Sequence, residues 1–260
     1  MLNFLGMPAA ASAHAGEIDQ MLVLVHWLML VLFVGWGAFF VFVLVRFRKS
    51  ANPKADYHGA KGKFAKSIEV AVAVVEVLLL VFYAIPAWAK RVTNLPSGSD
   101  AIIVRVVGEQ FAWNIHYPGA DGKFGRTDIK LVSADNPLGL DRKDPDAKDD
   151  ITTINQLNVP VGHPILVHLS SKDVIHSFGL YEMRIKQDAI PGLEMPVWFV
   201  PTITTNDMRA KLKNPTFDYE ITCSQLCGLG HYRMRGFINV QSEADYGKWM
   251  ADQVKELAKP

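Results

Sequence analysis

The sequence predicts a two-helix membrane hairpin followed by an all-β barrel outside the membrane. Two long apolar stretches occupy the N-terminal third of the chain, short β-rich runs follow, and one segment near the C-terminus gathers Cys, His and Met. A composition of 50% hydrophobic and 20% charged residues over 260 positions excludes wholesale disorder. The net charge of +1 excludes a strongly basic nucleic-acid binder.

The two apolar stretches predict two membrane spans. Met21–Val45 contains no Asp, Glu, Lys or Arg, and Ile68–Ala89 has Glu69 and Glu76 as its only charged residues. A helix of either length can cross a hydrocarbon core about 30 Å thick. The alternative is a pair of buried helices in a soluble protein.

The charges that flank the spans predict their orientation. Seven Lys and Arg residues and one acid occupy the connecting segment 46–66, whereas residues 1–20 contain no Lys or Arg. The positive-inside rule then places the connecting loop in the cytoplasm and both termini outside. The motif Ala13-His14-Ala15 is typical of a signal-peptidase site, but no charged or apolar leader precedes it. Residues 1–20 are therefore either an outer-face segment or a signal remnant, followed by a hairpin at 21–91.

The region 92–260 is predicted to be the β domain. After a linker at 94–99, eight β-rich runs alternate with Gly, Pro, Asn and Asp, which is typical of a sandwich or barrel. The segment from Ser242 to Asp245 resembles a helix start, so a C-terminal helix is expected to close the domain. The eight runs are 102–107, 110–117, 129–132, 154–159, 165–170, 197–200, 217–222 and 236–241.

The segment C-S-Q-L-C-G-L-G-H-Y-R-M carries the chemistry. It supplies two thiols, an imidazole and a thioether from Cys223, Cys227, His231 and Met234. Thiolate and thioether are soft ligands and imidazole suits copper, so the set favours copper over magnesium or calcium. Zinc competes less well because structural zinc sites are built from Cys and His. A further ligand is wanted, and His176 in D-V-I-H-S-F is the candidate.

These motifs resemble subunit II of the haem–copper cytochrome c oxidases. The pattern C-S-x-L-C-G-x-G-H-x-x-M is preceded by D-V-x-H-S-F and by K-x-D-A-I-P-G at 186–192, and the resemblance covers essentially the whole chain. It implies a cupredoxin-like barrel that holds a binuclear copper centre, CuA. Cys223 and Cys227 would bridge the two coppers.

The resemblance also implies the remaining ligands and the partners. His176 and His231 would cap one copper each, with Met234 and the backbone carbonyl of Gln225 as weak outer ligands. In the family this centre takes single electrons from a cytochrome c-type donor and passes them to haem in subunit I. Oxygen is reduced to water there, coupled to proton translocation. The implied setting is the respiratory chain of a bacterial inner membrane. The implied partners are subunit I, other oxidase subunits, lipid and a soluble or membrane-attached donor.

Three positions, 225, 111 and 76, depart from the family, and a fourth, Glu69, matches it. Gln225 stands where the family has a magnesium-binding Glu, so the magnesium site does not carry over. Phe111 stands where the family has an electron-accepting Trp. Phe111 and Trp113 are therefore candidates for that role, although Trp113 is equally compatible with an aromatic residue in the core of a strand.

Two acids of the second span bear on proton uptake. Glu69 matches a family glutamate at the mouth of a proton-uptake route, or it is an interfacial acid with no function. Glu76 lies two turns deeper, where an unpaired acid costs about 2–3 kcal/mol or more, and is expected to face subunit I.

Two other functions compete with an oxidase subunit. A membrane-anchored copper-binding or assembly protein with a cupredoxin domain needs no acid pair in its second span. A copper reductase resembling nitrous oxide reductase needs a large extra domain. A quinol oxidase subunit of the same fold lacks the copper ligands, which this chain has, and no C-x-x-C-H motif indicates a fused haem.

Overall fold

The computed structural model describes residues 5–54, 57–58, 62–97 and 100–257. The chain divides into two compact units. Glu17–Lys90 forms a helical hairpin, and Pro8–Gly16 joins residues from Arg91 onward in a β domain. Parts of the expected cytoplasmic loop (55–56 and 59–61) and of the expected linker (98–99) lie outside the described residues.

Part of the expected N-terminal segment 1–20 packs with the β domain. Pro8–Gly16 packs with the β domain: the Ala11 amide donates to the Glu182 carbonyl over 2.8 Å, and the Ser12 hydroxyl donates to the Met183 carbonyl over 2.7 Å. Ala11 is fully buried. Small side chains allow this close approach of backbone to backbone, so the Ala-rich composition has a packing role here.

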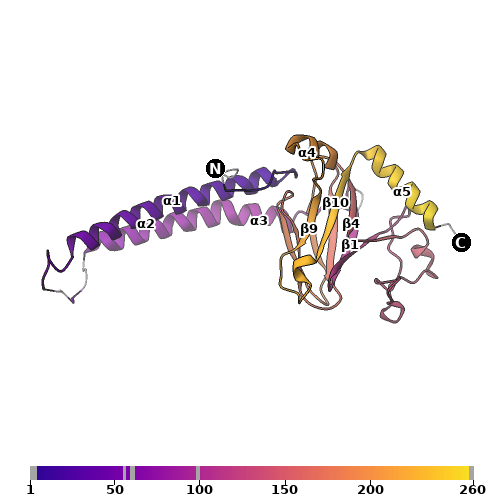
Figure 1. Cartoon of the computed structure of the whole chain (residues 1–260), viewed down its shortest axis with the longest axis horizontal. Helices are drawn as coiled ribbons and strands as arrows, with labels where there is room; N and C mark the ends of the chain where they lie inside the picture. The colour runs from indigo at the N-terminus through magenta and orange to yellow at the C-terminus, as the bar shows by residue number, and fades with distance from the viewer. Residues whose placement is uncertain (1–4, 55–56, 59–61, 98–99, 258–260) are drawn as a thin grey trace. The chain divides into compact units, whose positions relative to one another are not determined.

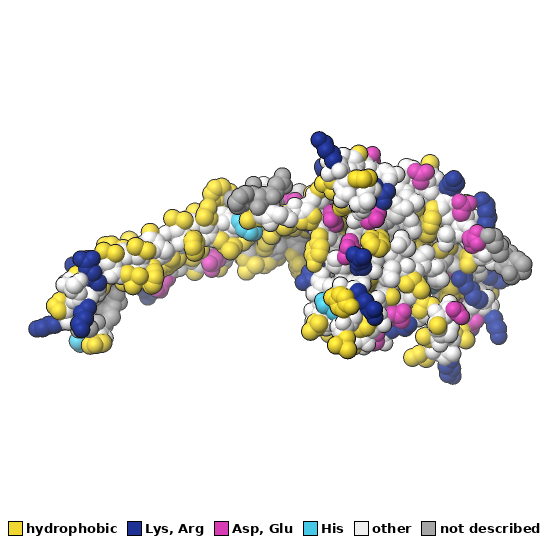
Figure 2. Space-filling model, viewed as in Figure 1, with side chains coloured by type: hydrophobic (Ala, Val, Ile, Leu, Met, Phe, Trp, Pro, Cys, Tyr) yellow, Lys and Arg dark blue, Asp and Glu magenta, His cyan; other side chains and the backbone are white. Residues whose placement is uncertain are grey.

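Two helices in the hairpin are long and apolar enough to cross a membrane, Ala15–Arg46 and Lys63–Val92. The first is α1, and the second comprises α2 (Lys63–Leu79), a π-helical turn (Leu80–Ala84) and α3 (Ile85–Val92). Apolar side chains line their surface, while Lys and Arg gather at the hairpin tip (Figure 2). The π turn lies just before Pro86. Proline has no N–H to donate, and in a regular α-helix its ring would clash with the carbonyl four residues earlier, so the helix widens locally at this turn.

Two five-stranded sheets form the β domain (Figure 1). In the first, order β3-β2-β1-β5-β8, only β1 and β5 pair in parallel. In the second, order β4-β10-β9-β6-β7, only β10 and β4 do. The strands of the first sheet are β1 (Ile102–Glu109), β2 (Ala112–Tyr117), β3 (Ile151–Ile154), β5 (Ile165–Ser171) and β8 (Met195–Phe199). Those of the second are β4 (Gln156–Pro160), β6 (His176–Leu180), β7 (Ile185–Ala189), β9 (Tyr219–Cys223) and β10 (Arg235–Gln241).

The hydrophobic core lies between the two sheets. Alternate residues of β1 point into it, with Val104 and Val106 fully buried. Trp113, Phe178 and Phe199 are the bulky fully buried rings from three other strands. Their packing fixes the strand ends on which the Cys and His side chains are placed.

Three local predictions differ from the structure. The run at 129–132 is a 3₁₀ turn, Ile129–Leu131, within the long β2–β3 connection. The run at 154–159 is two strands, because Asn155 adopts a left-handed φ of 58° and breaks it. Strands β6 and β7 and the helix α4 (Thr205–Leu212) were not predicted. The C-terminal helix is confirmed as α5 (Glu243–Leu257), with the Ser242 hydroxyl accepting from the Asp245 amide.

Candidate metal centre

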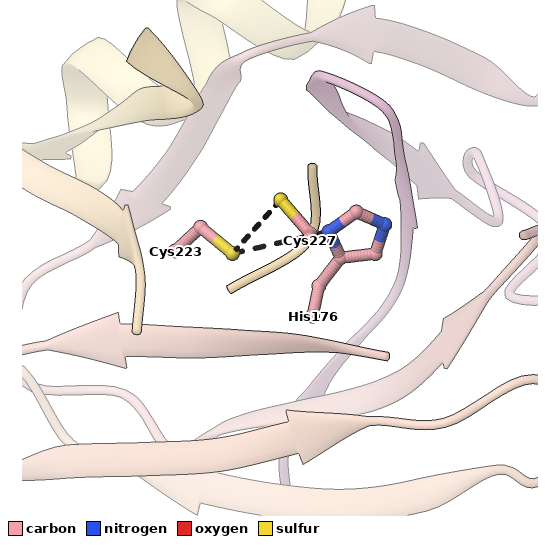
Figure 3. Close-up of side chains that lie close together, drawn as sticks. All are labelled: His176, Cys223 and Cys227. Carbon is pink, nitrogen blue, oxygen red and sulfur yellow. Dashed lines mark hydrogen bonds between the residues drawn. The ribbon is translucent and has the colours of Figure 1, made fainter. Parts of the chain in front are cut away.

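Three segments of the β domain bring the predicted ligands together. His176 begins β6, Cys223 ends β9, and Cys227 lies in the loop between β9 and β10. Ligand atoms of these three residues all lie within 4.8 Å of one another. Figure 3 shows the His176 ring and both sulfurs converging on one point.

The distances join the remaining candidates to the same cluster. Cys223 Sγ lies 3.8 Å from Cys227 Sγ and 3.8 Å from His176 Nδ1. Cys227 Sγ lies 3.7 Å from His231 Nδ1 and 3.7 Å from Met234 Sδ. The Gln225 carbonyl oxygen lies 3.2 Å from Cys223 Sγ. Two sulfurs therefore sit in the middle, with one imidazole on each.

These separations fit a metal site. Nitrogen and sulfur ligands bind at about 2.0–2.3 Å from metals of this kind, so two atoms that share one ion are up to roughly 4.5 Å apart. The five pairwise separations, 3.2–3.8 Å, are shorter than that. The set of two thiols, two imidazoles and one thioether is soft, which suits copper.

The loop backbone holds this arrangement. The Cys223 amide donates to the Met234 carbonyl over 3.3 Å, and the His231 amide donates to the Gly228 carbonyl over 3.1 Å. Gly228 has φ = +135°, a conformation that side chains with a Cβ rarely adopt. At Gly230 a Cβ would meet the Phe111 ring at 2.4 Å, so this glycine allows the loop to lie directly on that ring.

Sequence reasoning missed two residues that position the ligands. Asp173 Oδ1 lies 2.8 Å from His176 Nε2, the ring nitrogen opposite the one that faces Cys223. Asp173 Oδ2 accepts from the Gln110 amide over 2.7 Å, and the Gln110 side chain donates to the Cys227 carbonyl over 2.5 Å. A carboxylate on the far nitrogen fixes a ligating His in one orientation. The spacing of three residues between Asp173 and His176 was the available signal.

The two thiols differ in acidity. Burial opposes ionisation of Cys223, but hydrogen bonds from His176 and from the backbone of residues 177 and 225 lower the pKa of this thiol to about 6. Burial, with the neighbouring Cys223, raises the pKa of the Cys227 thiol to about 11. At neutral pH Cys223 is thus available as a thiolate, whereas Cys227 has to release a proton when it ligates a metal.

The two aromatic candidates lie beside the cluster in different ways. Trp113 is fully buried, and its ring packs edge-on at 6.0 Å from the His176 ring and 5.5 Å from Phe178. Phe111 is only partly buried and contacts the loop at Gly230. The interpretation of Trp113 as a core residue of a strand is therefore confirmed.

The same loop exposes large apolar side chains. Leu226, Leu229 and Tyr232 are 80%, 98% and 86% exposed, although the ligands between them are buried or half-buried. A loop with this pattern offers an apolar contact surface directly above the cluster.

The two acids of the second span lie in the hairpin. Glu76 lines a groove of about 350 Å³ between α1 and α2, with Leu28 and Tyr83. Glu69 lines another of about 430 Å³, with Trp36 and Phe39. Both acids are exposed in the chain taken alone and share one helix face.

Fold and cluster together define a membrane-anchored β domain with a soft-metal site, and comparison with known proteins gives its family. Residues 102–242 match the family described as cytochrome c oxidase subunit II, periplasmic domain. The chain is 32% identical over 239 residues to the alternative cytochrome c oxidase subunit 2 of Bradyrhizobium diazoefficiens, covering 92% of this chain and 80% of the relative. The chain belongs to the cytochrome c oxidase subunit II family.

The chain is also similar to a more distant relative and to one solved structure. Cytochrome c oxidase subunit 2 of Cereibacter sphaeroides is 26% identical over 251 residues, covering 87% of this chain and 75% of the relative. The periplasmic domain of subunit II from Bradyrhizobium japonicum, a crystal structure, is 26% identical over 63% of this chain and 99% of that chain, with a TM-score of 0.42. The family match over residues 102–242 identifies the β domain as the cupredoxin-like periplasmic domain of the family, and copper binding and electron transport follow from the family.

Proposed function

We propose that this chain is the electron-accepting subunit of a haem–copper terminal oxidase and holds a binuclear CuA centre. Cys223 and Cys227 would bridge the two coppers, and His176 and His231 would each bind one. Met234 and the Gln225 carbonyl would complete the site. The observation that carries the proposal is the pair of sulfurs 3.8 Å apart, each with its own imidazole nitrogen at 3.7–3.8 Å.

Copper bound there would take up and release single electrons. The chain's own residues keep that site rigid. Asp173 and the Cys223 thiol hold the His176 ring from opposite sides, and Gln110 holds the loop through the Cys227 carbonyl. A site that does not rearrange suits one-electron transfer, and the carboxylate tunes it through the imidazole.

Electrons would arrive at the loop surface from a cytochrome c-type donor. The exposed side chains of Leu229 and Tyr232 offer an apolar contact, and Phe111 lies against the loop backbone beneath. Phe111 would therefore stand at the point of arrival. Trp113, fully buried and edge-on to His176, would serve by packing the ligand and not by meeting the donor.

The hairpin would attach the chain to haem-bearing subunit I in a bacterial inner membrane. The basic tip would lie in the cytoplasm and the copper domain in the periplasm, as the distribution of Lys and Arg predicts. Glu69 and Glu76 would face subunit I and serve proton uptake. Their support is their position on one helix face and the cost of leaving such an acid against lipid. Gln225 offers no carboxylate, and no magnesium site is proposed.

Electron paramagnetic resonance on the full chain in detergent, loaded with copper, tests the proposal. One unpaired electron shared over two equivalent coppers is the expected spectrum. A single-copper spectrum would overturn the bridging by Cys223 and Cys227. It would favour the alternative of a membrane-anchored copper-binding or assembly protein. Copurification from the native membrane separates the two further, because only an oxidase subunit should bring haem-bearing partners with it.

A further inference from the structure

A row of three basic side chains crosses the outer face of the first sheet. Arg105 on β1 is in register with His116 on β2 and with His168 on β5. Residues in register point to the same face, and the neighbours Val104 and Val106 point into the core, so this row points away from it. We call His116, Arg105 and His168 the basic row.

The two ends of the basic row have acidic partners. His116 Nε2 lies 2.6 Å from Asp150 Oδ2, with both side chains buried, and His168 Nδ1 lies 2.7 Å from Glu194 Oε1. Arg105 differs. Across the described parts of the chain, no carboxylate oxygen comes within 4.0 Å of its guanidinium.

Stacking holds the Arg105 guanidinium in place. Its Cζ lies 4.1 Å from the centre of the Phe124 ring, and the His116 ring lies 4.9 Å from the same centre, edge-on. A guanidinium stacked on an aromatic face keeps its N–H donors free at the edge. Arg105 is therefore fixed in position while its hydrogen-bonding capacity stays available.

A cavity of about 420 Å³ opens beside Arg105, under the β2–β3 connection. The volume lies within the range of small-molecule sites. Its one acidic wall residue, Asp128, accepts a hydrogen bond from the Lys130 amide, and its Lys172 pairs with Glu109. The rest of the wall is mainly apolar, with Thr127 and the paired His116 as its other polar members; its apolar side chains are Val107, Ile129, Val132, Pro137 and Leu138.

We propose that this cavity binds a small organic carboxylate. The carboxylate would accept hydrogen bonds from the Arg105 guanidinium, and the apolar body would rest on Ile129, Val132 and Leu138. An arginine with a planar fork of donors matches a carboxylate in two-point contact. The apolar wall selects against hydrated inorganic anions, which would leave it without contacts.

Fluorine NMR on the full chain in detergent tests this site with 4-fluorophenylacetate as the probe and its neutral amide as the control. The acid should show line broadening on adding protein, and the amide at least about tenfold weaker binding, because a charge-assisted pair is lost. Arg105→Gln should weaken acid binding by about tenfold or more. Leu138→Trp should abolish it by filling the cavity while Arg105 stays intact.

Lys211→Gln on α4 is the matched control, since it removes one exposed positive charge elsewhere in the same domain. It should bind the acid like the unchanged chain. Equal binding of acid and amide, or unchanged binding by Arg105→Gln, would overturn the assignment of Arg105. Absence of any broadening at about 1 mM probe would overturn the site itself. The copper spectrum of each variant shows independently that the domain is folded.

Discussion

The metal loop and the second apolar helix both carry side chains for which we propose a function, but only the first set has hydrogen-bonding neighbours around it in the described chain. The ligands around Cys227 are held by neighbours in the same domain, including Gln110 and Asp173. Glu69 and Glu76 instead stand exposed among apolar side chains of the hairpin. The proposed metal site can therefore be tested in this chain alone, whereas the proposed role of the two acids has to be tested in a membrane with the proposed partner subunit.

The largest effect should come from removing a bridging sulfur. Cys223→Ser is expected to abolish the two-copper spectrum and to leave below about 1% of electron transfer, because hydroxyl is a poor ligand for soft metals. Ser224→Ala is the control, since this side chain bonds Tyr181 and belongs to no proposed ligand set. Paramagnetic resonance reads both variants. A two-copper spectrum from Cys223→Ser would mean that the site is not built as the distances indicate.

The next effect compares a buried tryptophan with one on the hairpin. Trp113→Ala should lower the free energy of unfolding of the β domain by about 3–5 kcal/mol, because it leaves a cavity beside His176. Trp88 is 64% exposed, so Trp88→Ala should lower the free energy of unfolding by less than about 1 kcal/mol. Chemical denaturation followed by near-ultraviolet circular dichroism measures both. Equal losses would show that the two regions do not differ in packing as described.

A smaller effect is expected at the carboxylate behind the ligand. Asp173→Asn should weaken copper affinity by about 10–100-fold, because the imidazole loses its charged partner but keeps its place. Asp188→Asn, an exposed acid on β7, should leave the affinity unchanged. Competition with a copper chelator gives the constants. If the copper affinity of Asp173→Asn were unchanged, the contact between Asp173 and His176 would contribute nothing to metal binding.

The smallest effect should appear only in the assembled oxidase. Glu76→Gln is expected to lower turnover and proton uptake by roughly threefold to tenfold, with the copper spectrum unchanged. Glu69→Gln, measured in parallel, shows which acid dominates. If both variants retain full turnover and proton uptake, the acids serve no proton route. If Glu76→Gln alters the copper spectrum, the two regions are coupled and the comparison fails.

The sequence predicted the parts of this molecule that rest on local pattern. The two long apolar helices and the C-terminal helix follow from hydropathy and capping, and the candidate ligands that the structure brings together were selected by side-chain chemistry at fixed spacing. Asn155 was missed because a left-handed φ interrupts a run whose composition reads as one continuous strand. The prediction of a strand at 129–132 was wrong because its Ile and Val favour strands, whereas the Asp128 side chain accepts from the Lys130 amide and caps a 3₁₀ turn there.

What the sequence could not predict depends on contacts between distant positions. Gln110 reaches the Cys227 carbonyl across 117 residues, and Arg105 lies between His116 and His168 only because three strands pair in one register. Such neighbours arise from the sheet order, which local periodicity does not encode. Asp173 stood within a recognised motif, yet its role required the orientation of the His176 ring.

The direct seating of Gly230 on the Phe111 ring links two positions in their evolution. Any side chain at 230 would need the space that the ring occupies, so a larger residue there should coincide with a smaller one at 111 among relatives. Substitution of Phe111, for which we propose a place at electron entry, would therefore be constrained by a glycine 119 positions away. An aromatic ring at 111, whether the Phe of this chain or the Trp that the family has there, is therefore expected to coincide with Gly at 230.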